Sequence, residues 1–181
     1  MANPQPGIEV TDPARYQART LDRLSGRDPV EVLTQTPDLL TKIVQTHSAD
    51  TLRRRPFEGK WTPAEVIGHL VDTEWVYGFR LRVVLCEERP TVLGMNQELW
   101  VVGQKHNERE PAELVETFAA LRKANLVLWR RLTPEQLARV GVHNERGPET
   151  LELMRRLSAG HDISHLDQIN RYIAAVEAAR K

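Results

Sequence analysis

Cysteine is nearly absent from this sequence, since Cys86 is the only one in 181 residues. A single cysteine excludes a disulfide framework and also a cysteine-rich zinc knuckle. Cys86 stands near the expected end of a helix and has no histidine beside it in the sequence to activate its thiol. We therefore expect a structural role for Cys86, packed as a small apolar residue, and not a nucleophilic one.

An excess of charge of either sign is also missing, because 25 basic residues balance 25 acidic ones. Binding to nucleic acid would call for a basic excess on one face, so no nucleic-acid partner is expected. No apolar run is long enough to cross a bilayer, and residues 1–7 lack the charged and apolar segments of a signal peptide. These absences predict a cytoplasmic protein with no membrane association.

Strand patterns are missing as well, because no segment alternates β-branched and polar residues with a period of two. Helix signals are abundant instead, and the clearest is Thr62-Pro63-Ala64-Glu65. Thr62 can cap the amide of Glu65 while Glu65 reaches back to the amide of Thr62, and Pro63 suits the first helical position. Apolar residues at helical spacing then predict a helix that continues to about Glu87.

The other helices are predicted from proline start signals and apolar periodicity. A kink or a break is expected near Thr36, because Pro37 falls inside the second helical segment. Helices are predicted to start at Asp12-Pro13, Asp28-Pro29, Pro111, Thr133-Pro134 and Pro148, the last running to about Ala179. The fold class is therefore all-α, a four-helix bundle with short accessory helices, and the four tryptophans are expected to pack inside it.

The remaining segments are assigned to connections. Residues 1–10 are predicted to be a flexible arm in front of a single domain spanning residues 11–181. Residues 141–147 are expected to form a polar loop. Residues 88–110 are expected to form a long loop, and a loop of that length in a compact domain suggests a lid over a functional site.

Three of the six histidines can converge on one metal ion. His161 and His165 are spaced i, i+4, which places both imidazoles on one face of a helix. His69 lies on the apolar stripe of the helix that starts at Pro63, and a bundle can bring the two faces together. Three imidazoles with an open fourth position are typical of a catalytic metal site. Helical phase alone does not distinguish a metal site from three ordinary buried histidines.

The other polar candidates carry weaker patterns. His47, His106 and His143 are expected to be solvated surface residues, although the long loop gives His106 some chance of lining a pocket. Asp162 points about 100° away from its neighbour His161, so it would orient a ligand or lie on the surface. Gln168 shares the ligand face and could hydrogen-bond a metal-bound water or simply line the edge of the core. The His-Glu-x-x-His motif of zincin proteases is missing.

Two sequence blocks resemble the DinB/YfiT-like family. The first is residues 59–70, which contain Trp61-Thr62-Pro63 and His69-Leu70. The second is residues 161–169, which contain His161 and His165 followed by Gln168-Ile169. The resemblance covers about residues 15–177. It implies a four-helix bundle that holds a divalent metal, usually nickel or zinc, through three histidines, here His69, His161 and His165.

The resemblance implies several chemistries without choosing among them. Some relatives are thiol S-transferases that use a low-molecular-weight thiol, and others are described as metal-dependent hydrolases. We expect an enzyme whose metal activates a thiol for transfer to a small electrophile. Activation of water for hydrolysis and a non-catalytic, metal-stabilised stress-response or binding protein are the alternatives. A homodimer is expected by family analogy alone.

Overall fold

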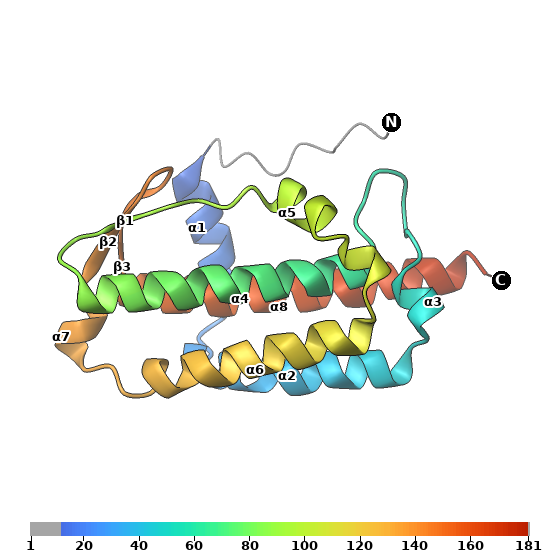
Figure 1. Ribbon diagram of the computed structural model, residues 1–181, viewed down its shortest axis with the longest axis horizontal. Helices are drawn as coiled ribbons and strands as arrows, with labels where there is room; N and C mark the ends of the chain where they lie inside the picture. The colour runs from blue at the N-terminus through green and yellow to red at the C-terminus, as the bar shows by residue number, and fades with distance from the viewer. Residues whose placement is uncertain (1–11, 181) are drawn as a thin grey trace.

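The computed structural model describes residues 12–180, and the expected arm at residues 1–10 lies outside them. Four long helices pack side by side, α4 against α6 and α8, and α2 against the same two partners (Figure 1). Their bounds are α2 (Pro29–Thr46), α4 (Pro63–Cys86), α6 (Pro111–Trp129) and α8 (Leu151–Ala178). The predicted all-α fold, a four-helix bundle with accessory elements, is confirmed.

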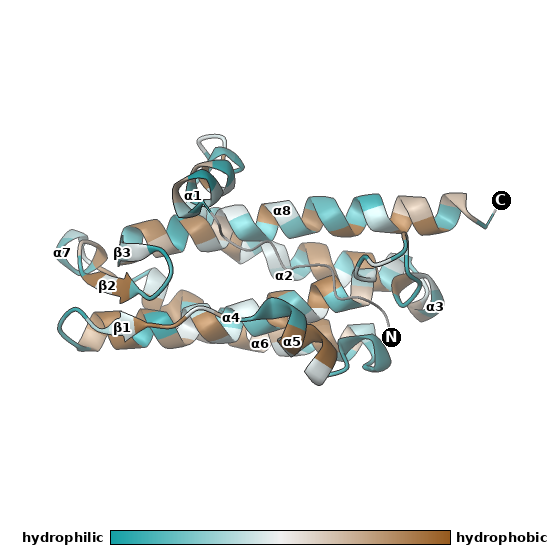
Figure 2. Ribbon diagram, turned by 90° about the horizontal axis from the view of Figure 1, so that it is seen from above, coloured by the Kyte–Doolittle hydropathy of each residue, from teal (hydrophilic) through white to brown (hydrophobic). Residues whose placement is uncertain are grey.

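The accessory elements lie around the bundle, with α7 and α3 at its opposite ends (Figure 1). They are α1 (Pro13–Asp22), α3 (Ala49–Leu52), α5 (Gln97–Gly103), the 3-10 turn η1 (His106–Glu108) and α7 (Pro134–Leu137). Seen from above in Figure 2, α1 packs across α8 on one side while α5 packs beside α4 on the other. The interface between α4 and α8 therefore has accessory helices on both of its sides.

The start of α4 is fixed by the predicted capping box. Oγ1 of Thr62 accepts a hydrogen bond from the Glu65 amide at 3.1 Å, and Oε2 of Glu65 accepts one from the Thr62 amide at 2.7 Å. Pro63 occupies the first turn, where its missing N–H is not needed. These contacts set the rotational phase of α4, so they determine which of its side chains face α8.

Of the kink or break expected near Thr36, the break is wrong, since α2 continues through Pro37 to Thr46. A proline inside a helix leaves the carbonyl four residues earlier without its partner. That carbonyl belongs to Leu33, and it accepts a hydrogen bond from Nη1 of Arg122 at 2.8 Å. The lost helical bond is therefore replaced from α6, which explains why the helix is not interrupted.

A buried ion-pair network joins three helices in the bundle interior. Arg122, 1% exposed, donates to Oδ2 of Asp162 and to Oε2 of Glu74, both at 2.7 Å. Asn125 donates to Oε1 of Glu74 at 2.8 Å. Asp162 was expected to orient a ligand or to lie on the surface. Both expectations are wrong, because its carboxylate is turned into the bundle toward Arg122.

A small sheet closes one end of the bundle, where loops were expected up to residue 147. The predicted start of the last helix at Pro148 is wrong, because Pro148 belongs to this sheet and α8 begins at Leu151. The sheet consists of β1 (Thr91–Val92), β2 (Val140–His143) and β3 (Gly147–Thr150), in that order, with β1 parallel and β3 antiparallel to β2. The 141–147 segment is therefore a hairpin and not a simple loop. Strands this short cannot show a measurable alternation of residues, which is why the sequence did not indicate them.

Two expectations about side chains are wrong. Trp129 is buried at 3% exposure, but Trp75 and Trp100 are 60% and 40% exposed and do not pack inside the bundle. Cys86 is also exposed, at the end of α4, so it has no packing role. Within residues 12–180, no helix has the length and apolar character needed to cross a membrane.

Candidate metal centre

His69 on α4 and the pair His161 and His165 on α8 converge across the interface of these two helices. Nε2 of His161 lies 3.1 Å from Nε2 of His69 and 3.0 Å from Nε2 of His165. One ligand atom from each of the three lies within 4.8 Å of the others. The structure thus brings together the three histidines that the sequence singled out, and we call this group the three-histidine centre.

The contacts among the three rings are hard to satisfy without a cation. A neutral ring nitrogen has either one hydrogen or one lone pair, so Nε2 of His161 cannot form two normal hydrogen bonds to its neighbours. Three lone pairs directed at one cation remove this conflict. Tetrahedral nitrogen ligands about 2.05 Å from zinc are about 3.3 Å apart, close to the separations seen here. The donor set therefore fits a divalent metal ion.

Burial keeps these imidazoles neutral, as metal ligands must be. Burial is the main cause that lowers the pKa of His69 and His161 well below 6.5, and His165 adds to the effect on both. The pKa of His165 is lowered by burial to about 4. His161 and His165 keep some exposed surface, whereas His69 is only 1% exposed. Solvent therefore reaches the centre on the side of the α8 histidines.

Gln168 contacts the side of the His165 ring that faces away from the other two histidines. Its Oε1 lies 2.8 Å from Nδ1 of His165, the ring nitrogen turned away from the other two histidines. An amide oxygen accepts only, so this contact places the hydrogen on Nδ1 and leaves a lone pair on Nε2. The sequence had suggested a bond from Gln168 to a metal-bound water. The structure instead pairs its oxygen with a ligand ring.

Trp61 and Glu98 lie beside the centre on the α4 side. The ring of Trp61 packs against that of His69, with centroids 5.1 Å apart. Its Nε1 donates to Oε2 of Glu98 at 3.1 Å. Because Glu98 belongs to α5, this bond ties the accessory helix to the wall of the centre. Nothing in the sequence marked Glu98, since its proximity depends on how the 88–110 segment folds back.

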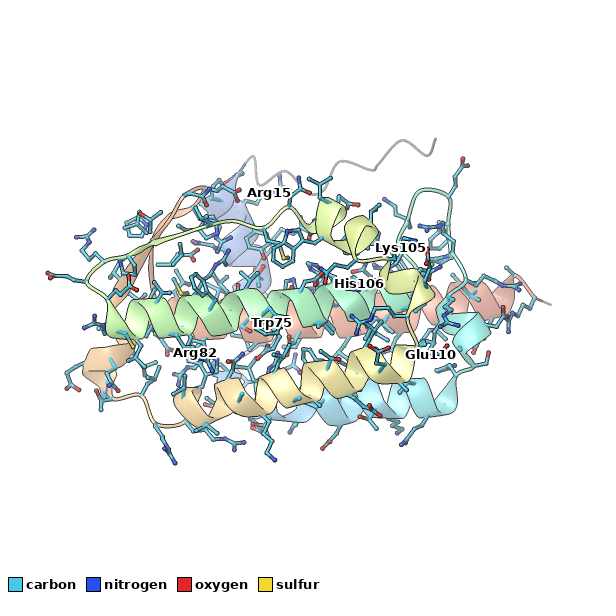
Figure 3. All side chains as sticks on the ribbon, viewed as in Figure 1. Arg15, Trp75, Arg82, Lys105, His106 and Glu110 are labelled. Atoms are coloured by element: carbon cyan, nitrogen blue, oxygen red, sulfur yellow. The ribbon has the colours of Figure 1, made fainter. Side chains whose placement is uncertain are left out.

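His106 was expected at the surface, but the structure buries it completely against α4. Its Nε2 lies 2.8 Å from Oδ2 of Asp72, and Gln104 donates to Oδ1 of the same carboxylate at 2.7 Å. A Cβ at Gly68 would lie 2.2 Å from Cγ of His106, so only glycine admits the ring there. Figure 3 shows His106 just above α4. The 88–110 segment is therefore a folded cover fixed to α4.

His143 is likewise buried, at 1% exposure, because it belongs to β2 and not to a polar loop. Its Nδ1 accepts a hydrogen bond from the Glu145 amide at 3.1 Å, and burial lowers its pKa to about 4. Only His47 has the expected surface setting, paired with Glu177 at 3.0 Å. Neither histidine belongs to the three-histidine centre.

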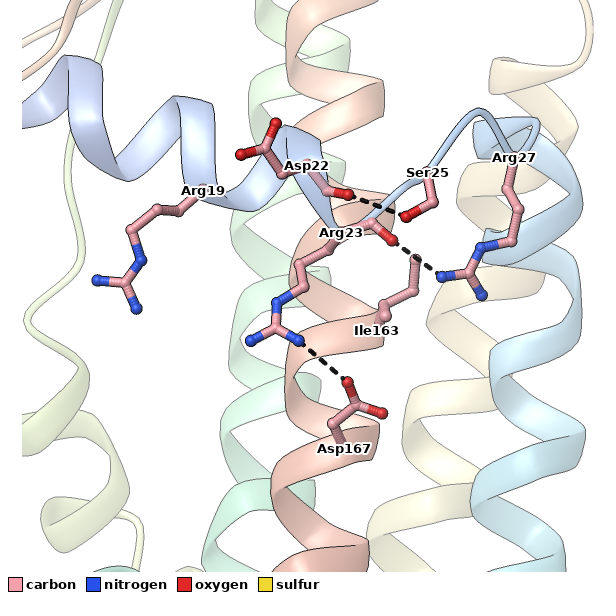
Figure 4. Close-up of a pocket in the computed structure, with 7 residues that line it drawn as sticks. All are labelled: Arg19, Asp22, Arg23, Ser25, Arg27, Ile163 and Asp167. Atoms are coloured by element: carbon pink, nitrogen blue, oxygen red, sulfur yellow. Dashed lines mark hydrogen bonds and ion pairs between the residues drawn. The ribbon is translucent and has the colours of Figure 1, made fainter.

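A surface pocket of about 460 Å³ lies between α1 and α8, away from the centre (Figure 4). Ile163 and Asp167 line it, and each stands two residues beyond a ligand, about 200° around α8. Its charges are largely satisfied locally, since Arg23 pairs with Asp167 at 3.3 Å and Arg27 donates to the Arg23 carbonyl. We therefore assign no chemistry to this pocket.

Comparison with known proteins places this arrangement in a recognised group. Residues 32–169 match the model of the DinB superfamily. "Putative metal-dependent hydrolase YfiT" of Bacillus subtilis is 24% identical over 150 residues, which cover 78% of this chain and 82% of that protein. "Putative metal-dependent hydrolase OB0413" of Oceanobacillus iheyensis is 28% identical over 131 residues, covering 72% and 75%.

One solved structure shares the whole fold. It is YfiT from Bacillus subtilis, described as a probable metal-dependent hydrolase with an unusual four-helix bundle topology. The two chains superpose with a TM-score of 0.72 at 22% sequence identity, over 95% of this chain and 93% of that one. The likeness extends beyond the bundle to nearly the full length of both chains.

Proposed function

Because this chain belongs to the DinB superfamily, we propose that it is a metal-dependent enzyme that transfers a low-molecular-weight thiol to a small electrophile. The observation that carries the proposal is the convergence of three Nε2 atoms, with separations of 3.1 and 3.0 Å around His161. Zinc and nickel are the metals proposed, since three imidazoles suit both.

A bound divalent metal supplies a Lewis acid that lowers the pKa of a thiol or of a water molecule. The protein's own part is to hold three neutral imidazoles in place. Gln168 fixes the tautomer of His165, and Trp61 packs against the ring of His69. The cover is fixed to Asp72 and bonds to Trp61 beside the centre, and we infer from this placement that it limits access of bulk water and favours reaction with a bound thiol.

The carboxylates around the centre favour a thiol over water as the nucleophile. Hydrolysis calls for a general base near the attacking water. Asp72 is occupied by His106, while Glu74 and Asp162 both pair with Arg122 inside the bundle. A thiol has an ordinary pKa of about 8.5, far below the value of about 15.7 for water, so its activation makes less demand on neighbouring bases.

Hydrolysis is the second candidate, favoured by the names of the relatives and by Glu98. The carboxylate of Glu98 is partly exposed and bonds to Trp61, which itself packs on His69. If water is the nucleophile, Glu98 is the residue on the described chain best placed to act as its base.

A substrate panel separates the two candidates. Metal-loaded protein is incubated with low-molecular-weight thiols and electrophiles, and in parallel with esters and amides, and both kinds of product are measured. We expect thiol transfer that is lost in His161→Ala and retained in Glu98→Gln. Ester or amide cleavage that falls at least tenfold in Glu98→Gln, without any thiol transfer, would overturn the proposal.

A further inference from the structure

A second group of buried and half-buried polar side chains lies between α1, α4 and the β2–β3 hairpin. We call it the arginine–tyrosine cluster, and its members are Tyr16, Tyr77, Arg80, His143, Arg146 and Glu149. The guanidinium of Arg80 lies over the ring of Tyr77 at 5.6 Å, and that of Arg146 lies over the ring of Tyr16 at 5.9 Å. The cluster therefore joins four elements through aromatic and charged contacts.

The charges in this cluster do not balance. Glu149 is bound by Arg146 through two hydrogen bonds of 2.6 and 3.0 Å and by Gln17 at 2.9 Å. Burial lowers the pKa of His143 to about 4 and raises that of Tyr77, so both are neutral near pH 7. One carboxylate thus faces two guanidinium groups, which leaves one buried positive charge in excess.

Arg80 is the cation that has no ion-pair partner within residues 12–180. It is 4% exposed, and its hydrogen bond goes to a neutral group, the Leu93 carbonyl. Its Nε has no hydrogen-bond partner among residues 12–180, and the same holds for Nε2 of His143. An unpaired buried cation is costly, so proteins retain one mainly where a ligand or a reaction uses it.

The cluster lies on the same face of the bundle as the three-histidine centre. Along α4, His69, Thr73, Tyr77 and Arg80 follow one another at steps of four, four and three, so they share one helical face. All four are buried. The stretch from His69 to Arg80 spans about 16 Å of helix, a distance that an extended small thiol with a terminal carboxylate can bridge.

We propose that Arg80, supported by Tyr77 and Arg146, binds a carboxylate of the substrate whose reacting end lies at the three-histidine centre. This inference rests on the proposed function and adds the substrate class to it, a small thiol that carries a carboxylate at its far end. The guanidinium donates two hydrogen bonds to the carboxylate, one of them from the unpartnered Nε. Tyr77 covers the ion pair and excludes water from it.

The test measures binding, not turnover. Calorimetry follows the binding of ω-mercaptocarboxylates of increasing length, and of the matching ω-mercaptoalcohols, to the metal-loaded protein. We expect the carboxylates to bind more tightly, with an advantage that is greatest at an intermediate length. Arg80→Gln should reduce that advantage about 10- to 100-fold, whereas Arg80→Lys should restore part of it.

Arg82→Gln is the matched control, because Arg82 stands on α4 about 200° from Arg80 and donates to Asn125 at 2.7 Å. It should leave the carboxylate advantage unchanged. An equal affinity for carboxylates and alcohols at every length in the unmodified protein would overturn the inference, whether or not Arg80→Gln folds. An advantage that Arg80→Gln leaves intact would overturn it too.

A further titration keeps this inference separate from the proposed function. Metal-free protein is titrated with alkane carboxylates, which lack the thiol. Binding that depends on Arg80 supports the carboxylate site even if thiol transfer is never observed. The protein could instead show normal metal content and thiol transfer, with carboxylate binding that does not depend on Arg80. That result would support the proposed function and contradict the carboxylate site.

Discussion

Oε1 of Gln168 lies 2.8 Å from Nδ1 of His165, three residues earlier on α8. Because the amide oxygen can only accept, this contact orients the imidazole and directs its Nε2 lone pair toward His69 and His161. Among the three ligands, His165 alone has such support in the structure described, since Nδ1 of His69 and Nδ1 of His161 have no hydrogen-bond partner there. The centre therefore depends on Gln168 more than on other neighbours.

Gln168→Ala should weaken metal binding about 10- to 100-fold, the usual effect of removing a partner that orients a ligand. Competition with a chromophoric chelator measures the affinity. Asp167→Ala is the control, because Asp167 lies next to Gln168 but pairs with Arg23 on the outer side of α8. An equal loss of affinity in both variants would contradict the role assigned to Gln168.

The stability of the metal-free protein should fall as the pH drops from about 6.5 toward about 4. Burial holds the pKa of His165 at about 4, whereas an unfolded histidine has a pKa of about 6.5. In that window the unfolded chain binds more protons than the folded one, so protonation favours unfolding. His165→Gln should make the decline shallower in urea titrations at several pH values. The same substitution at the surface residue His47 should leave the decline unchanged, and an equal effect at both sites would refute the explanation.

Gly68→Ala should destabilise the protein by about 1–3 kcal/mol, although alanine is the better helix former. The added Cβ would lie 2.2 Å from Cγ of His106, so the buried ring would have to move from α4. Gly103→Ala is the matched control, because nothing lies within 4 Å of its Cβ position. Urea unfolding measures both. A neutral Gly68→Ala would show that His106 does not fix the cover to α4.

Arg122→Met should cost about 3–5 kcal/mol of unfolding free energy, because it leaves the carboxylates of Glu74 and Asp162 buried without a cation. The Leu33 carbonyl would lose its donor as well. Adding Asp162→Asn to the variant should recover part of the loss. Arg130→Met, which removes an exposed arginine just after the end of the same helix, should change stability by no more than about 0.5 kcal/mol. Similar losses in the two single variants would argue against the network.

Local signals account for what the sequence predicted well. The Thr62 cap and the spacing of His69, His161 and His165 are properties of single helices, so the sequence alone revealed the start of α4 and the inner faces of α4 and α8. Once two such faces are known to pack in a bundle, the three-histidine centre follows. The bundle itself was predictable for the same reason.

Long-range contacts account for the errors. His106 and His143 are buried by a folded-back cover and by a two-to-four-residue strand pairing, and neither leaves a periodic pattern in its own segment. The helix through Pro37 persists because Arg122, far away in the sequence, supplies a donor. The excess charge at Arg80 is visible only once α4 and the hairpin have been placed together.

The metal content of the purified protein tests the central claim most directly. Elemental analysis should find about one zinc or nickel per chain in the unmodified protein, as expected for one three-histidine site. His69→Ala and His161→Ala should each lower this to near zero while the helical circular dichroism stays unchanged, and His47→Ala should keep the full amount. Full retention of the metal in folded His69→Ala would contradict the account.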